Sequence, residues 1–205
     1  MIDAIHALAR LREGNRRFAS NQDRLPSQPS HRAALVNGQA PFAIILGCSD
    51  SRVPAEIVFD QGLGDLFVIR VAGNIVAPSQ IGSVEFAVSK FGTRLVVVLG
   101  HSRCGAVEAT LEELRRPSAK QSRYLYSIVD RVRPSVEPLL ATPLRDDPEA
   151  LMRDAVRANV RVSAGQLRHG SELLESLAGD GLLVVGAEYS LESGMVEFFD
   201  GVPAA

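Results

Sequence analysis

The sequence contains no tryptophan, and only two cysteines and four histidines among its 205 residues. Two cysteines are too few for a small scaffold held by several disulfide bridges. They are also too few for a structural zinc site that is built from four thiolates of one chain. The side chains that bind soft metal ions are therefore scarce, so their positions in the chain become informative.

A strong excess of positive or of negative charge is also absent, and so is any long apolar stretch. The formal net charge is -2, whereas a surface for nucleic acids is normally basic. No run reaches the length of about 18 apolar residues that a membrane-spanning helix needs. Residues 1–17 mix charged and apolar side chains, unlike a signal peptide. We therefore expect a cytoplasmic chain with reduced thiols and with neither a nucleic-acid nor a membrane partner.

Short apolar runs rich in valine and isoleucine predict the strands of the fold. Runs without polar alternation are typical of parallel strands that are buried on both faces. Segments with helical periodicity separate them, which predicts an α/β fold with a mostly parallel central sheet of four or five strands flanked by helices. The expected strands are residues 42–47, 65–71, 94–100 and 181–186, with 195–200 as a further edge strand.

The helical segments and their order predict the domain organisation. Residues 21–30 should form an extended arm or loop, and residues 117–148 a helical insertion rather than a linker. Because no repeat or second set of strands divides the chain, we expect a single domain over residues 1–205, with 1–35 as an N-terminal helical arm. The expected helices are residues 1–20, 54–60, 78–91, 105–116 and 148–177, the last one interrupted near Gly170.

Both cysteines and one histidine follow directly on two of the predicted strands. Cys48 comes after residues 42–47, and His101 and Cys104 come after residues 94–100. In an open α/β sheet ligands bind outside the carboxyl ends of the strands, so the two loops should face the same region. Two thiols and an imidazole are ligands that zinc prefers, and three protein ligands leave a fourth position open. From the residues alone, burial of both cysteines as small apolar side chains is an equal alternative.

An aspartate and an arginine stand beside this group in the sequence. Asp50 and Arg52 lie two and four residues after Cys48. A carboxylate at this place can bind a metal or be drawn away from it, and a guanidinium can hold a carboxylate through two parallel hydrogen bonds. A surface ion pair of small effect is the alternative, but the place beside three candidate ligands favours a functional pair.

These motifs resemble those of the β-class carbonic anhydrases. The segment 48–53 reads Cys-Ser-Asp-Ser-Arg-Val, and the segment 100–106 reads Gly-His-Ser-Arg-Cys-Gly-Ala. The pattern Cys-x-Asp-x-Arg, followed about fifty residues later by His-x-x-Cys, is the specific part of this resemblance. Residues 13–18, 64–70, 72–74 and 82–87 are also similar to the family, so the likeness covers nearly the whole chain and is weakest over residues 117–148.

The resemblance implies an activity and roles for the residues. Cys48, His101 and Cys104 would bind one zinc ion per chain, and a zinc-bound hydroxide would attack carbon dioxide to give bicarbonate and a proton. Asp50 and Arg52 would form a gate on the fourth zinc position, closed when Asp50 occupies it. Hydrolysis of carbonyl sulfide or carbon disulfide by the same ligand set is the alternative activity. A non-catalytic metal or thiol sensor is the remaining one, and it should lack the Asp-Arg pair.

The resemblance also implies an anion site and self-association. In some bacterial members an arginine, a tyrosine and a tryptophan hold bicarbonate in a non-catalytic pocket. Arg70 and Tyr189 stand at matching places, and Gly105 is a further candidate, but Ile45 occupies the tryptophan position. Structural hydrogen bonding by Arg70 and Tyr189 is an equal alternative. The family's sites lie at a dimer interface, so we expect a dimer or tetramer; a first helix packed on its own chain is the alternative to one that embraces a neighbour.

Overall fold

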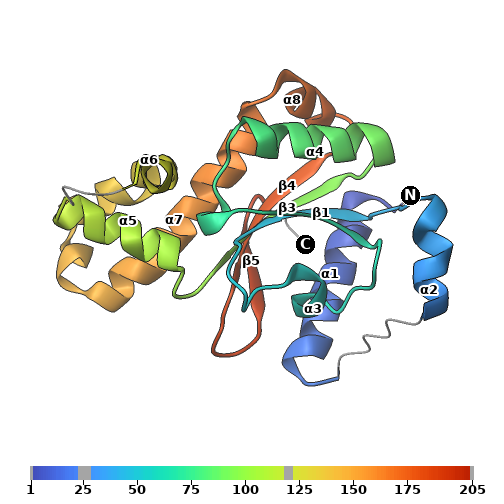
Figure 1. The fold of residues 1–205 in the computed structure, drawn as a ribbon, viewed down its shortest axis with the longest axis horizontal. Helices are drawn as coiled ribbons and strands as arrows, with labels where there is room; N and C mark the ends of the chain where they lie inside the picture. Colours follow the sequence, from blue (N-terminus) through green and yellow to red (C-terminus); the bar gives the residue numbers. More distant parts are fainter. Residues whose placement is uncertain (1, 23–28, 118–121, 204–205) are drawn as a thin grey trace.

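The computed structural model describes residues 2–22, 29–117 and 122–203. Five strands of this part form one sheet in the order β2-β1-β3-β4-β5 (Figure 1). The first four are parallel, and β5 runs antiparallel to β4 at the edge. The predicted α/β fold is therefore confirmed. The strands are β1 (Ala43–Gly47), β2 (Leu66–Arg70), β3 (Leu95–His101), β4 (Leu183–Tyr189) and β5 (Val196–Asp200).

The helices lie between the strands as the periodicity predicts. The long C-terminal helix is interrupted at Gly170, and the described part of residues 117–148 is helical, as expected. The extended arm expected at residues 21–30 lies largely outside the described residues. No described helix is both long and apolar enough to cross a membrane. The helices are α1 (Ala4–Ala19), α2 (Pro29–Ala34), α3 (Ala55–Val58), α4 (Pro78–Phe91), α5 (Gly105–Arg115), α6 (Arg123–Val136), α7 (Pro148–His169) and α8 (Glu172–Ala178), with short 3-10 segments η1 (Leu35–Asn37), η2 (Ala72–Asn74), η3 (Glu137–Ala141) and η4 (Pro143–Asp146).

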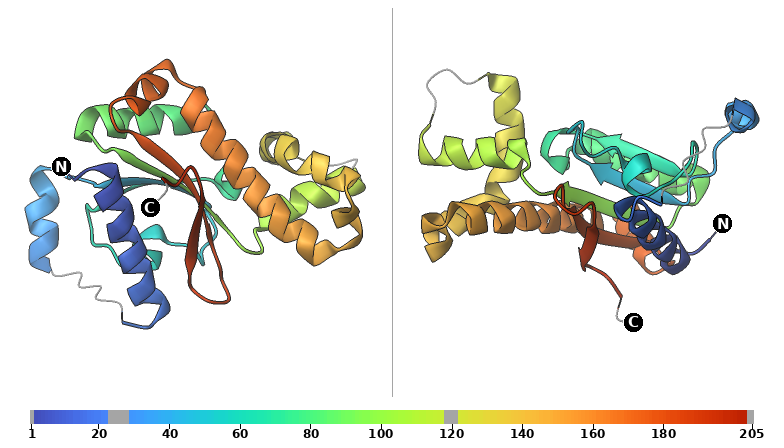
Figure 2. Two further views of the ribbon diagram at one scale, coloured as in Figure 1. Left: turned by 180° about the vertical axis from the view of Figure 1, so that it is seen from behind. Right: turned by 90° about the horizontal axis from the view of Figure 1, so that it is seen from below.

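Helices cover both faces of the sheet, which explains why its strands lack polar alternation. Ile45 and Val97 point to the face packed by α1 and α3. Ile44 and Val96, their neighbours in sequence, point to the opposite face, where α4, α7 and α8 pack (Figures 1 and 2). Because successive side chains of a strand alternate between faces, a strand covered on both sides must be apolar throughout.

A third apolar cluster lies beyond the carboxyl ends of β1 and β3. Side chains of α5, α6 and the first half of α7 form it, together with Cys48, Ile75 and Cys104. In Figure 1 these helices extend to one side of the sheet as a helical lobe. The loops that follow β1 and β3, which carry Cys48 and Cys104, thus meet at the junction between the sheet and the lobe.

The first helix packs on the sheet of its own chain. Ala7, Leu8 and Leu11 of α1 are buried in the cluster on that face. Asn15 is buried and donates hydrogen bonds to the carbonyl oxygens of Val58 and Gly194, 3.1 and 2.9 Å away. The first helix was expected either to pack on its own chain or to embrace a neighbouring one. Its buried face packs on its own chain.

Gly14 permits this close packing, and its replacement by alanine should destabilise the fold. A Cβ atom at Gly14 would overlap the carbonyl oxygen of Phe59, which is backbone and cannot swing away. We expect Gly14→Ala to lower the free energy of unfolding by about 3 kcal/mol, the upper part of the range for overpacking. Each kcal/mol lowers the melting temperature by about 2–4 °C in a chain of this size.

Gly165→Ala is the matched control, because it makes the same change inside another helix. A Cβ atom at Gly165 meets nothing within 4 Å. It should stabilise α7 by about 0.5–1 kcal/mol through helix propensity. Thermal unfolding followed by circular dichroism checks both variants, and a Gly14→Ala chain that melts as high as the unaltered one would refute this account of the α1 contact.

Candidate metal centre

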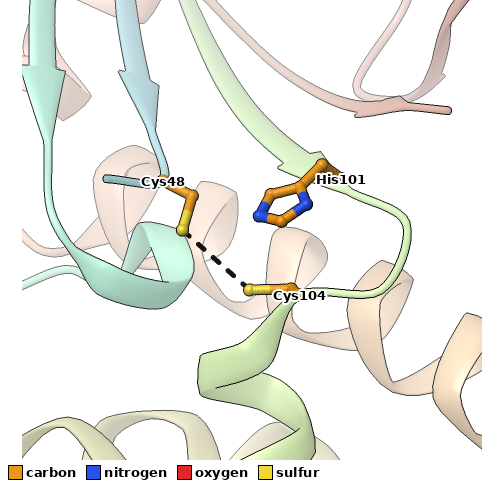
Figure 3. Close-up of side chains that lie close together, drawn as sticks. All are labelled: Cys48, His101 and Cys104. Atoms are coloured by element: carbon orange, nitrogen blue, oxygen red, sulfur yellow. Dashed lines mark hydrogen bonds between the residues drawn. The ribbon is translucent and has the colours of Figure 1, made fainter. Parts of the chain in front are cut away.

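Three candidate ligands meet at the junction of the sheet and the helical lobe. Cys48 follows the last residue of β1, His101 ends β3, and Cys104 is the N-cap of α5. Their ligand atoms all lie within 4.8 Å of one another, and the two sulfur atoms are 4.0 Å apart (Figure 3). All three side chains are buried. The structure thus brings together the residues that the sequence placed at two separate strand ends.

The orientation of His101 suits metal binding. Its Nδ1 atom lies 2.9 Å from the carbonyl oxygen of Ser102, which can only accept, so Nδ1 carries the proton. Nε2 then carries a lone pair, and it is buried without a hydrogen-bond partner among the described residues. Leaving a buried acceptor unpaired is costly. A metal ion at the cluster would satisfy Nε2, and the Nδ1 bond is the usual support of a metal-binding histidine.

The two thiols differ in their affinity for a proton. The hydrogen bond with Cys48, followed by burial, raises the pKa of Cys104 well above its usual range. The same bond is the largest influence on Cys48, and with contributions from His101 and the amide of Gly73 it lowers the pKa of that thiol. Cys48 is therefore the more acidic thiol of the pair. A cation bound between the sulfur atoms would favour loss of the remaining proton, and two sulfurs with one imidazole nitrogen form a donor set that suits zinc.

Arg52 holds Asp50 beside the cluster. Its Nε and Nη2 atoms donate to Oδ1 and Oδ2 of Asp50 over 2.9 and 2.7 Å, and its backbone amide donates to Oδ1 over 3.0 Å. These bonds hold the pKa of the Asp50 carboxyl far below its usual range. Oδ2 lies 3.9 Å from Nε2 of His101. A charged carboxylate thus stands next to the three ligands and is retained by a guanidinium.

Arg70 supports the same loop from the neighbouring strand. It donates from Nε to the carbonyl oxygen of Cys48 over 2.9 Å and from Nη2 to that of Asp50 over 2.6 Å. These bonds fix the backbone between the first ligand and Asp50. They are structural hydrogen bonds of the kind that the sequence left open for Arg70.

The other anion-site candidates lie apart from Arg70. Tyr189 ends β4, and β1 and β3 separate that strand from β2, so the strand axes are about 14 Å apart. The Tyr189 ring lies 6.3 Å from that of Phe18 in the apolar core, where Ile45 is also buried. Gly105 begins α5, directly after Cys104. A bicarbonate site at these residues stays a prediction.

Ser102 has a role at the centre that its place in the motif did not indicate. Its hydroxyl donates to Oε2 of Glu192 and accepts from the amide of Leu191, both over 2.9 Å. Its amide donates to the carbonyl oxygen of Tyr189 over 2.9 Å. Ser102 therefore ties the loop after His101 to the turn between β4 and β5. Only the pairing of distant segments reveals this, because serine in a loop carries no such signal.

By sequence the chain is similar to known carbonic anhydrases. The family model described as Carbonic anhydrase matches residues 43–196. A protein of Mycobacterium tuberculosis named carbonic anhydrase 2 is 41% identical over 194 residues, which cover 94% of this chain and 91% of that protein. A carbonic anhydrase of Mycolicibacterium smegmatis is 41% identical over 192 residues, covering 91% of this chain and 89% of that protein.

The fold is also similar to solved structures. A structure of a tetrameric β-carbonic anhydrase from Sordaria macrospora has a TM-score of 0.75 and 26% identity, with 98% of each chain covered. A β-carbonic anhydrase of Coccomyxa, solved in complex with acetazolamide, has a TM-score of 0.73 and 25% identity, with 94% of this chain and 86% of that chain covered.

Proposed function

Since this chain belongs to the β-class carbonic anhydrase family, we propose that it catalyses the zinc-dependent, reversible hydration of carbon dioxide to bicarbonate and a proton. The buried group of Cys48, His101 and Cys104 is the observation that carries this proposal. Its two sulfurs and one imidazole nitrogen would hold one zinc ion and leave one coordination position for the reaction. The zinc, when bound, supplies a Lewis acid that makes water a nucleophile near neutral pH.

The residues of the chain prepare this position in three ways. Thiolates from Cys48 and Cys104 together balance the charge of a divalent cation. The bond from Nδ1 of His101 to Ser102 keeps Nε2 directed at the cluster. Burial of all three side chains keeps bulk water from the ligands, which strengthens each electrostatic contact at the centre.

Asp50 and Arg52 would control access to the open position. While Arg52 holds both carboxylate oxygens, Oδ2 keeps a further lone pair that can accept a hydrogen bond from the reacting water or from bicarbonate. Without Arg52 the carboxylate could move to the cluster, because Oδ2 is already within 3.9 Å of Nε2 of His101. We therefore propose that this pair is the gate of the enzyme, open when the ion pair is formed.

Metal analysis combined with activity assays on the unaltered chain tests the proposed function. We expect about one zinc per chain and rapid hydration of carbon dioxide, measured by stopped-flow proton release. Hydrolysis of carbonyl sulfide and carbon disulfide should be assayed on the same preparation, because the same ligand set could serve them. A zinc-loaded chain that hydrolyses either compound but leaves carbon dioxide unchanged would overturn the substrate assignment.

We also propose that the chain acts as a dimer or tetramer in the cytoplasm. The tetrameric relative from Sordaria macrospora supports self-association, and Ile2 and Ile5 of this chain are exposed beside the buried face of α1. The cytoplasm suits thiolate ligands, which must stay reduced. Light scattering after size exclusion should give a mass of at least two chains, whereas a monomer mass at every concentration would contradict the proposal.

A further inference from the structure

A buried asparagine links the centre of α7 to the loop that contacts the metal cluster. Asn159 is 1% exposed, and apart from Ser163 the other buried residues of α7 are apolar. Its Nδ2 atom donates to the carbonyl oxygen of Gly73 over 2.7 Å, and its Oδ1 atom accepts from the hydroxyl of Ser135 at 3.4 Å. A buried amide requires such partners, and here one of them is backbone next to a candidate ligand.

Gly73 passes this contact on to the metal cluster. It has a φ of 68° and a ψ of 23°, a left-handed conformation that favours glycine. Its amide donates to the sulfur of Cys48 over 3.3 Å. A Cβ atom at Gly73 would lie 3.0 Å from that of Ala106, so the segment is also tightly packed against α5. Because φ and ψ of Gly73 fix how its carbonyl group and its N–H group are oriented to one another, the hydrogen bond from Asn159 to the carbonyl oxygen also sets the direction of the N–H bond.

A hydrogen bond to a thiolate changes how the sulfur binds a metal. The donor draws electron density from the sulfur lone pairs, so the thiolate donates less charge to the cation. Partners outside the ligand set commonly tune a metal centre in this way. At this centre, the Gly73 amide acts on one of only two sulfur ligands.

We propose that Asn159 is a positioning residue for the metal centre: through Gly73 it holds a hydrogen-bond donor on the sulfur of Cys48 and so limits the charge that this thiolate donates. The inference rests on metal binding by the proposed function. If Asn159 were only a structural link between α7 and η2, its replacement would change the stability of the fold and leave the metal–sulfur bond unaltered. The proposal requires a change in the metal–sulfur bond itself.

Cobalt-substituted protein distinguishes the structural role from the positioning role. Charge transfer from sulfur to cobalt gives an absorption band, and its energy depends on the metal–sulfur bond rather than on the stability of the fold. Asn159→Asp keeps the shape of the side chain but, when ionised, has no donor for the Gly73 carbonyl. Asn159→Ala removes both bonds. In both variants the band should move to lower energy, since a sulfur without the amide bond holds its electrons less tightly.

Leu167→Ala is the matched control. Leu167 is fully buried further along α7, in the cluster that packs on the sheet rather than at the metal centre. Its loss should destabilise the fold by about 2–5 kcal/mol and leave the charge-transfer band in place. A band that is unmoved in a folded Asn159 variant, or that moves equally in Leu167→Ala, would overturn the proposal.

The unaltered chain provides a test that needs no variant. Loaded with ¹¹³Cd, it should show coupling between the metal and the amide proton of Gly73 through the Cys48 sulfur. Absence of this coupling in a loaded, folded chain would overturn the inference and leave the proposed function standing. A chain that binds none of these metals would instead refute the proposed function, and this inference with it.

Discussion

Cys48→Ser should remove both the metal and the activity. A serine hydroxyl is a harder ligand with a much higher pKa than a thiol, so it does not replace the thiolate at a soft zinc site. The chain contains only one other cysteine, Cys104, and it already belongs to the cluster. Mutation of residues that only support the ligands typically lowers metal affinity or activity by about 10–100-fold. Loss of a direct ligand should therefore lower both by more than about 100-fold.

Elemental analysis and stopped-flow hydration of carbon dioxide measure this loss. Ser49→Ala is the matched control, because it changes the exposed neighbour of Cys48 in the same loop. It should keep its zinc and its rate. Circular dichroism should show that Cys48→Ser retains its secondary structure. Full activity in a zinc-free preparation of Cys48→Ser would refute the proposed mechanism.

Arg52→Ala should separate zinc binding from activity. It leaves the three ligands in place, so the zinc content should stay near one per chain. It removes the two side-chain hydrogen bonds that hold Asp50, whose Oδ2 atom is 3.9 Å from Nε2 of His101. The freed carboxylate can then occupy the open position, and we expect the hydration rate to fall by about 100-fold or more, as misplaced catalytic groups commonly cause.

Two further variants identify the cause of that fall. Arg103→Ala removes a nearby guanidinium that pairs with Glu192 and is largely exposed, so it should change the rate only slightly. Adding Asp50→Ala to Arg52→Ala removes the blocking carboxylate and should recover part of the lost rate. A double variant no faster than Arg52→Ala would contradict the gate and would assign Arg52 a direct role with the substrate instead.

The sequence alone determined the class of the fold. Its four apolar runs predicted the four parallel strands, because a strand buried on both faces leaves no polar position for its residues. Residues 195–200, expected as a further edge strand, form the antiparallel β5. It also placed Cys48, His101 and Cys104 at strand ends. Loops after parallel strands converge at one edge of a sheet, so the meeting of these residues followed from topology before any distance was known.

The supporting contacts depended on the tertiary structure. Asn159 and Gly73 are 86 residues apart, and an asparagine in a helical pattern is usually exposed to solvent. Gly14 carries no local sign of the Phe59 carbonyl that faces it. Patterns in a sequence report the periodicity of the backbone and the burial of one face, and they are read within short windows of the chain. Hydrogen bonds between distant segments depend instead on how packed elements are placed, and only the folded chain decides which amide reaches the Cys48 sulfur.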